Sequence, residues 1–443
     1  MHLPPTDGLQ PGDDDYLVSR RYAWFVFAMT FALMLFDYID RQIVVSMFPH
    51  LKAEWDLSDK QLGALVSVVA TVVALGTVPI ALLADRWSRV KSIVVMATIW
   101  SLATIGCGFA LNYTQLFAGR AFIGLGEAGY GPAAGALLAS LFPVRMRATV
   151  LGGFIAAGAL GSVLGVVLGG FIAQHWGWRA AFGVVGFPGL VLALAFLFVR
   201  DYKTVPLQVK QGAGAPRGTV RTIAAALLEP RTALLVCVGS GLQLFVLSTI
   251  YTWMPSFLNR YYGLASDQAG AKTAIVILVG AIGTVAWGNL ADRAGYKHPR
   301  RKLYVVAAAC MLTLVLLSVA FAVLPPGPLQ FALIAAGSFG LTCTLGTVPA
   351  VVMDVVHPGV RATATAMVTL LQNLLGLAAG AFVAGALSDA FGLQTALAVI
   401  PVASLGAALL FIFAARSYEA DKQRLGATRV SVDSAATLGA APA

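Results

Sequence analysis

Residues 151–172 read LGGFIAAGALGSVLGVVLGGFI, a run without a charged residue and without the strict alternation of a half-buried strand. Its length matches the roughly 20 apolar residues that a helix needs to cross the hydrocarbon core of a bilayer. A transmembrane β-barrel would instead need segments of about ten residues that alternate between apolar and polar side chains. The stretch therefore predicts a transmembrane helix.

The composition of the whole chain agrees with a bilayer as its solvent. Of 443 residues, 58% are hydrophobic and 11% are charged, and the mean hydropathy is +0.81. Soluble globular chains are about 45–50% apolar and about 25% charged. Too few polar side chains remain to cover a surface in water, so soluble enzymes, nucleic-acid-binding proteins and disordered chains are set aside.

Further apolar runs follow at short intervals, and cutting the chain at its polar and Gly/Pro-rich breaks predicts an all-α polytopic protein with twelve transmembrane helices. The predicted spans cover residues 22–49, 60–84, 92–111, 115–142, 148–173, 178–199, 232–257, 271–291, 303–324, 329–353, 362–387 and 394–415.

The basic residues of the short loops predict the orientation. Of the 30 Lys and Arg residues, two lie inside spans, and most of the others lie on the side that holds both termini. The five on the opposite side are Lys52, Lys60, Arg179, Arg260 and Lys272. Both termini are therefore expected in the cytoplasm, and the formal net charge of +10 is interpreted as a mark of topology rather than of a nucleic-acid partner. Residues 1–19 lack the pattern of a cleaved signal peptide, so the first span is expected to stay, in a bacterial inner membrane.

An internal repeat divides the chain into two halves. ALLADR at residues 81–86 returns as GNLADR at residues 288–293, which places Asp85 and Asp292 207 residues apart. The expected domains are an N-terminal tail, an N-terminal six-helix bundle, a cytoplasmic linker, a C-terminal six-helix bundle and a C-terminal tail, at residues 1–20, 21–200, 201–230, 231–416 and 417–443. Repeated bundles of this kind pack around a central pathway and give alternating access when one rocks against the other.

The stretch ALLADRWSRVK at residues 81–91 resembles the loop signature of the major facilitator superfamily, G-x-L-A-D-R-x-G-R-[RK]-x. Ala81 and Ser88 replace its two glycines. The resemblance implies the two-bundle major facilitator fold and a cytoplasmic gate motif made of Asp85, Arg86, Arg89, Asp292 and Arg293. A carboxylate at a helix end beside arginines can pair with basic groups and with a helix N-terminus. Simple anchoring on the cytoplasmic side explains Arg89 and Lys91 equally well.

Five ionisable residues lie deep in predicted spans: Asp37, Asp40 and Arg41 in the first, and Arg120 and Glu127 in the fourth. Each buried charge costs roughly 2.5–3.5 kcal/mol on insertion scales, so we expect these residues to be paired with one another or to have a function. The spacings within each span place them near one helical face. We therefore expect one partly self-neutralising cluster at matching depth in the N-terminal half.

The sequences FDYIDR at 36–41 and RAFIGLGEAGY at 120–130 are similar to motifs of the Spinster-type lysolipid transporters, and they share elements with the anion:cation symporters. Asp37 stands where the Spinster-type motif has Asn. The resemblance implies proton coupling at Glu127 and Asp40, with Asp37 as an added acid. It also implies Arg41, Arg120, Tyr38 and Tyr130 as charge or substrate partners. A static ion-pair network that only fixes helix packing is the alternative.

The C-terminal half carries no deep charge, so neutral side chains are expected to line its side of the pathway: Gln243, Tyr251, Gln372 and Asn373. Interhelical hydrogen bonds for the amides and an interfacial aromatic belt for Tyr251 remain the alternative. Pro255 is a candidate hinge for a gate. The G-x-G-x-x-G pattern at residues 124–129 lies inside an apolar span, so its glycines are interpreted as helix contacts and not as a dinucleotide site.

These features predict a proton-coupled secondary transporter that works by alternating access. It would be a monomer that moves an amphipathic anion like a lysophospholipid or a sphingolipid together with protons. A symporter of small organic acids or sugar acids is the alternative, and a drug/H⁺ antiporter or a channel is disfavoured. The five His residues and the missing G-x-x-x-x-G-K-[ST] loop give no support to a membrane enzyme, a metal site or an ATP-driven pump, so no cofactor beyond the proton gradient is expected.

Overall fold

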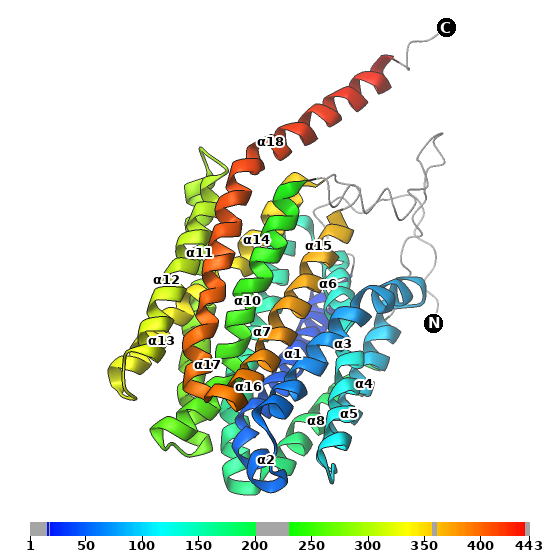
Figure 1. Cartoon of the computed structure of the whole chain (residues 1–443). Coiled ribbons are helices and arrows are strands. Elements are labelled where there is room, and N and C mark those ends of the chain that lie inside the picture. The colour runs from blue at the N-terminus through cyan, green and yellow to red at the C-terminus, as the bar shows by residue number, and fades with distance from the viewer. Residues whose placement is uncertain (1–15, 17, 201–229, 357–360, 439–443) are drawn as a thin grey trace.

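The computed structural model describes residues 16, 18–200, 230–356 and 361–438, which fold into helices joined by short turns (Figure 1). Most of the predicted N-terminal tail and nearly all of the predicted linker, residues 201–230, lie outside the described residues. We call the end of the bundle where α8 finishes and α10 begins the linker end, and the opposite end the far end.

The N-terminal half contains eight helices and one short turn among its described residues. They are α1 (Arg20–Ser46), α2 (Phe48–Trp55), α3 (Asp59–Arg86), α4 (Arg89–Cys107), α5 (Tyr113–Glu127), α6 (Tyr130–Leu141), α7 (Val144–Trp176), α8 (Trp178–Ala195) and the 3₁₀ turn η1 (Phe196–Phe198).

The C-terminal half repeats this plan with more interruptions. Its elements are α10 (Arg231–Tyr262), α11 (Ser266–Gly295), α12 (Arg301–Ala322), α13 (Pro328–Leu341), α14 (Thr344–Val355), α15 (Arg361–Leu371), the π-helix η3 (Gln372–Ala378), α16 (Ala379–Phe391), α17 (Leu393–Val399), the 3₁₀ turn η4 (Ile400–Val402) and α18 (Ala403–Leu438).

Eleven stretches of the described chain are long and apolar enough to cross a membrane, and they coincide with eleven of the predicted spans. The remaining prediction, residues 115–142, is two short helices, α5 and α6, which break at Ala128 and Gly129. The corresponding helix of the second half also breaks, at Thr342 and Cys343 between α13 and α14. Non-helical backbone at membrane depth is tolerated where it lies inside the protein or lines a cavity, so both breaks point toward the interior.

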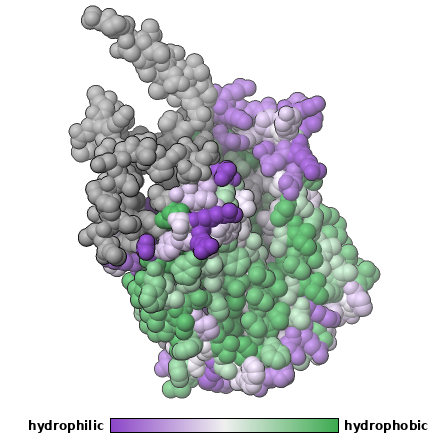
Figure 2. Space-filling view, turned by 180° about the vertical axis from the view of Figure 1, so that it is seen from behind, coloured by the Kyte–Doolittle hydropathy of each residue, from purple (hydrophilic) through white to green (hydrophobic). Residues whose placement is uncertain are grey.

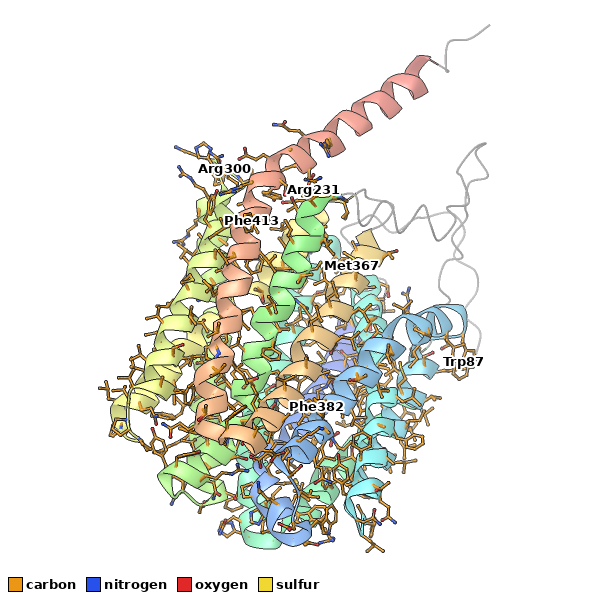
Figure 3. The ribbon with its side chains drawn as sticks, in the orientation of Figure 1. Trp87, Arg231, Arg300, Met367, Phe382 and Phe413 are labelled. Atoms are coloured by element: carbon orange, nitrogen blue, oxygen red, sulfur yellow. The ribbon has the colours of Figure 1, made fainter. Side chains whose placement is uncertain are left out.

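The surface matches a bilayer as well. Figure 2 shows a broad hydrophobic band across one face of the described part of the protein, with hydrophilic residues gathered toward its two ends. Large apolar side chains such as Phe122, Phe187 and Val285 are exposed. Arg231 and Arg300 lie at the linker end, where α18 leaves the bundle (Figure 3). A band of this kind is the surface of a multi-pass membrane protein.

Glycines allow the helices of the N-terminal half to approach closely. A Cβ on Gly161, Gly165 or Gly169 of α7 would lie 2.5–2.8 Å from a backbone oxygen of α1. A Cβ on Gly124 would lie 2.9 Å from the carbonyl oxygen of Val69, and a Cβ on Gly126 would lie 2.7 Å from the backbone nitrogen of Trp100. The G-x-G-x-x-G pattern is therefore a helix-packing device, as predicted.

A buried carboxylate joins the two halves at the far end. Asp59, at the start of α3, is only 2% exposed, and it accepts hydrogen bonds from Arg260 of α10 at 2.6 and 2.7 Å. Lys52 of α2 and Ser388 of α16 bind the same carboxylate. In return, Asp389 of α16 accepts hydrogen bonds from the first backbone N–H groups of α3, each at 2.8 Å. We call these residues the Asp59 network.

Close backbone contacts surround the Asp59 network. A Cβ on Gly63 of α3 would lie 2.4 Å from the carbonyl oxygen of Ala381, so α3 and α16 touch directly. His50 of α2 lies 3.0 Å from the hydroxyl of Ser266 in the other half. The side chain of Lys60 lies 5.5 Å from the ring of Phe382, which Figure 3 labels on α16. The far end is therefore closed.

We expect the Asp59 network to hold the far end shut. Truncating one partner of a buried, hydrogen-bonded charge pair costs about 2–5 kcal/mol. Arg260→Ala should therefore open this end. Spin labels on the exposed residues Ala53 and Gln268, one in each half, would report the change as a new, longer distance in double electron–electron resonance.

Arg179→Ala is the matched control. This arginine also lies at the far end, but it pairs with Glu54 of its own half at 2.7 Å, and its side chain is 42% exposed. The control should leave the distance distribution unchanged. An unchanged distribution in Arg260→Ala as well would show that packing alone closes the far end.

Candidate functional site

A cavity of about 760 Å³ lies between the two halves. It extends from the middle of α1 to Val78 of α3 and Thr363 of α15. Helices α1, α3, α5 and α6 supply the lining on one side: Met34, Asp37, Tyr38, Arg41, Val73, Thr77, Val78, Glu127, Ala128, Gly131 and Pro132. The other side is formed by Leu244, Leu345, Thr363, Thr365, Ala366, Thr369, Gln372, Asn373 and Leu377. With the far end closed, this cavity faces the linker end.

Arg41 is the centre of charge in the cavity. Its Nη2 atom lies 3.0 Å from Oε2 of Glu127, and its Nε atom lies 3.6 Å from Oδ1 of Asp37. Both carboxylates are buried, whereas the side chain of Arg41 is 20% exposed. The guanidinium also lies 5.3 Å from the centre of the Tyr38 ring. Two carboxylates thus share one guanidinium at the wall of the cavity.

Local structure explains how these groups meet. Asp37 and Arg41 are one turn apart on α1, and Glu127 is the last residue of α5. The break after Glu127 ends the helix at membrane depth. Close packing of α5 on α3 and α4 through Gly124 and Gly126 holds Glu127 in place. The charged cluster therefore lies at the junction of a continuous helix and a broken one.

Asp40 and Arg120 form a separate pair. Nη1 of Arg120 lies 3.6 Å from Oδ2 of Asp40, and both side chains are at most 2% exposed. Arg120 also donates hydrogen bonds to the carbonyl oxygens of Leu65 and Asp40, each at 3.3 Å. Neither residue lines the large cavity. The five predicted charges are therefore divided into a trio at the cavity and a buried pair behind it.

In the second half, Gln372 and Asn373 line the cavity as expected, at the start of the π-helix η3. Gln372 donates to the hydroxyl of Ser240 at 2.7 Å, and Asn373 donates to the carbonyl oxygen of Thr369 at 2.9 Å. Short π-helical segments occur frequently at functional sites. Here the segment supplies two of the polar residues that line the cavity.

Other predicted partners lie away from the large cavity. Gln243 donates to the carbonyl oxygen of Gly340 at 3.2 Å, which is the interhelical hydrogen bond considered as an alternative. Tyr130 is 1% exposed and donates to the carbonyl oxygen of Thr30 at 2.6 Å. Tyr251 is buried and lines a second, smaller cavity. Helix α10 runs through Pro255 without a break, and a hinge at this proline stays a prediction.

Of the predicted gate motif, the structure describes the side chains of Arg89, Asp292 and Arg293. Asp292 pairs with Lys302 of the neighbouring helix α12 at 2.9 Å, and Arg293 is exposed. Arg89 is half-buried. The side chains of Asp85 and Arg86 lie outside the described residues.

Sequence reasoning missed the Asp59 network and much of the cavity wall. Asp59 and Arg260 lie at span ends, where charges are ordinary. The sequence did contain one clue: only five basic residues were assigned to the loops at this end of the spans. Two of these five, Lys52 and Arg260, bind Asp59 in the structure. The cavity residues Met34, Thr77, Thr363 and Thr365 gave no signal, since neutral side chains are common in membrane helices.

Comparison with protein families places the chain among known transporters. A family model described as Major Facilitator Superfamily matches residues 30–380. An MFS-type efflux pump of Mycolicibacterium smegmatis is 29% identical over 403 residues, which is 89% of this chain and 90% of that protein. Protein spinster of Drosophila melanogaster is 26% identical over 384 residues, which is 84% of this chain and 62% of that protein.

Two further similarities concern substrates and conformation. The cis,cis-muconate transport protein of Acinetobacter baylyi is 28% identical over 290 residues, which is 64% of this chain and 68% of that protein. The fold also matches the crystal structure of a bacterial homolog of the human lysosomal transporter Spinster in an inward-facing, unoccupied conformation. The TM-score is 0.80 at 22% identity, over 91% of this chain and 99% of that chain.

The division of the charges predicts different outcomes for the two arginines. Arg120→Leu leaves Asp40 buried without its partner, and breaking a buried pair costs about 3–5 kcal/mol. We expect a clearly lower midpoint of thermal unfolding in detergent. Asp40→Asn/Arg120→Leu should recover much of this loss, because no charge remains unpaired.

Arg41→Leu is the matched comparison. The two carboxylates that pair with Arg41, Asp37 and Glu127, border the cavity and can take up protons from it. The loss of stability should therefore be smaller than for Arg120→Leu. Equal losses for the two single variants would contradict the separation of the trio from the pair.

Proposed function

The chain belongs to the Major Facilitator Superfamily, and on that premise we propose that it is a proton-coupled symporter that moves an organic anion by alternating access. The observation that carries the proposal is the trio at the cavity. Of the described residues that line the cavity, Arg41 is the basic one, and its guanidinium is held by Glu127 at 3.0 Å. An anion that enters must compete with Glu127 for Arg41.

Competition of this kind couples the anion to a proton. A negative charge released from its partner at membrane depth is costly, so Glu127 takes up a proton when the substrate displaces it. The loaded site then contains a neutral acid and a guanidinium–anion pair. When the anion leaves, Glu127 loses its proton and pairs with Arg41 again. Anion and proton therefore cross together, and the proton gradient supplies the energy.

Alternating access follows from the two ends of the bundle. The far end is held by the Asp59 network, and the cavity faces the linker end. Rocking of the halves would break the contacts of Arg260 with Asp59 and close the linker end through the predicted gate motif. With the linker end in the cytoplasm, as the loop charges indicate, the present conformation is the inward-facing one. We propose that the carrier does this as a monomer in a bacterial inner membrane.

The cavity favours an amphipathic anion as the substrate. Its volume of about 760 Å³ lies within the usual range for small-molecule sites. Apolar side chains such as Met34, Leu244 and Leu345 line it together with the guanidinium of Arg41. A charged head would bind at Arg41 while an apolar tail packs against these residues. Similarity to a Spinster protein supports this class.

A small organic acid is the second candidate. Three threonines of α15, Thr363, Thr365 and Thr369, give the second half a polar rim that suits a compact hydrophilic molecule. Similarity to a muconate transport protein supports the same class.

Uptake into proteoliposomes separates these two classes. Under an imposed pH gradient, 1-dodecanoyl-lysophosphatidate is expected to accumulate, because its tail fills the apolar part of the cavity. Glucuronate and cis,cis-muconate should accumulate far less. Proton-stimulated uptake of the small acids alone would reject the amphipathic class and retain the coupling.

Coupling itself is tested with Glu127→Gln. Glutamine cannot release a proton, so accumulation against a gradient should be lost, while exchange of labelled for unlabelled substrate continues. Glu54→Gln is the control, because this exposed far-end carboxylate pairs with Arg179 and should keep full coupling. Full proton-driven accumulation by Glu127→Gln would reject Glu127 as the coupling group.

A further inference from the structure

A second cavity lies on the far-end side of Arg41 and adjoins the large one. Its volume is about 80 Å³, and Arg41 and Leu377 line both cavities. The remaining lining residues come from α1, α3, α5 and α10: Gln42, Val45, Val66, Val69, Ala70, Arg120, Leu247, Ser248, Tyr251 and Thr252. We call this space the inner compartment.

Charge is distributed unequally between the two cavities. Both guanidinium groups, Arg41 and Arg120, line the inner compartment, and none of the described residues that line it carries a carboxylate. The two acids of the trio, Asp37 and Glu127, line the large cavity instead. An anion in the inner compartment would therefore meet both guanidinium groups, and it would compete there with Glu127 for Arg41 and with Asp40 for Arg120. Coulomb interactions are strong at this depth, since the effective dielectric constant is low.

Polar atoms at the inner compartment lack partners. Oε1 of Gln42 and the hydroxyl of Tyr251 are buried, and neither has a hydrogen-bond partner among the described residues. Ser248 and Thr252 bring hydroxyl groups from the other half, and Ser248 donates to the carbonyl oxygen of Leu377 at 2.8 Å. Buried polar atoms are nearly always satisfied in folded proteins, so these unpaired groups indicate a polar occupant.

The size of the inner compartment selects among anions. An apolar cavity of about 150 Å³ holds a benzene molecule, so a volume of 80 Å³ takes a group of roughly half that size. A carboxylate fits this space, whereas a phosphoglycerol or phosphocholine head does not. The rest of the substrate would remain in the large cavity.

We propose that the inner compartment is the binding site for the carboxylate of the substrate, and that the carrier therefore prefers amphipathic molecules that end in a bare carboxylate over those with a phosphodiester head group. This proposal rests on the proposed function and specifies its substrate class. Arg41 binds the anion from the compartment side while its other face releases Glu127. The hydroxyl of Thr252 and the amide of Gln42 complete the site.

Two probes with one acyl chain test this proposal: dodecanoate and 1-dodecanoyl-lysophosphatidylglycerol. Isothermal titration calorimetry of the purified full-length protein in detergent measures the affinity for each. We expect dodecanoate to bind at least about tenfold more tightly, a difference of about 1.4 kcal/mol, because only its head enters the compartment.

Ala70→Leu fills the compartment with three further carbon atoms and removes no polar group. It should weaken the binding of dodecanoate about tenfold and leave that of the lysolipid within threefold. Thr252→Val keeps the side-chain volume and removes one hydroxyl, so it should weaken the binding of dodecanoate but not that of the lysolipid. This second variant tests the proposal even if Ala70→Leu disturbs the fold. Thr369→Val, in the large cavity, is the matched control and should leave the ratio of the two affinities unchanged.

The outcomes separate the two proposals. Equal affinities of the wild type for both probes, or equal effects of Ala70→Leu and Thr252→Val on both, would show that the anion stays in the large cavity. The inner compartment would then hold water only, and the proposed function would stand. Unchanged binding of both probes by Arg41→Leu would instead reject the anion site of the proposed function itself.

Discussion

The ion pair between Arg41 and Glu127 connects a continuous helix, α1, to the end of a broken one, α5. A charge at this depth is tolerated only with a partner, and each of these residues serves as the partner of the other. Close packing of the surrounding helices brings these two side chains together. The glycines of α7 draw α1 into the bundle, and Gly124 and Gly126 bring α5 close to α3 and α4.

The two inter-helix charge networks differ in how well their groups are satisfied. The carboxylate of Asp59 receives hydrogen bonds from Arg260, Lys52 and Ser388. The carboxylate oxygens of Glu127, by contrast, are buried without a hydrogen-bond partner of good geometry among the described residues. A well-satisfied network stabilises one conformation, whereas an under-satisfied one gains energy from a new partner such as a proton or a ligand. The Asp59 network is therefore suited to hold the far end closed, and the Glu127 carboxylate is suited to a binding site.

The sequence alone predicts the spans well, because hydrophobic length is a property of each segment by itself. Even the broken fourth span was found as one apolar run, although Ala128 and Gly129 interrupt it. Helical spacing places Asp37, Asp40 and Arg41 near one face of α1, but it does not say which neighbour each of them meets. Asp40 turned out to face Arg120, and Arg41 to face Glu127. The pairing of charges depends on helix rotation and tilt, which only tertiary packing sets.

The repeat explains why the charges lie in one half. The spacing of 207 residues between Asp85 and Asp292 also relates Asp59, the start of α3, to Ser266, the start of α11. Applied to α1, it relates Arg41 to Ser248, and both residues line the inner compartment. A second arginine at Ser248 would need its own buried carboxylate, and the anion would then be bound equally by both halves. With a hydroxyl there, the N-terminal half supplies the charge of the inner compartment, and under the proposed function the C-terminal half would move against it. A ligand shifts a conformational equilibrium only by the difference in its affinity for the two states, and this asymmetry between the halves is a direct source of such a difference.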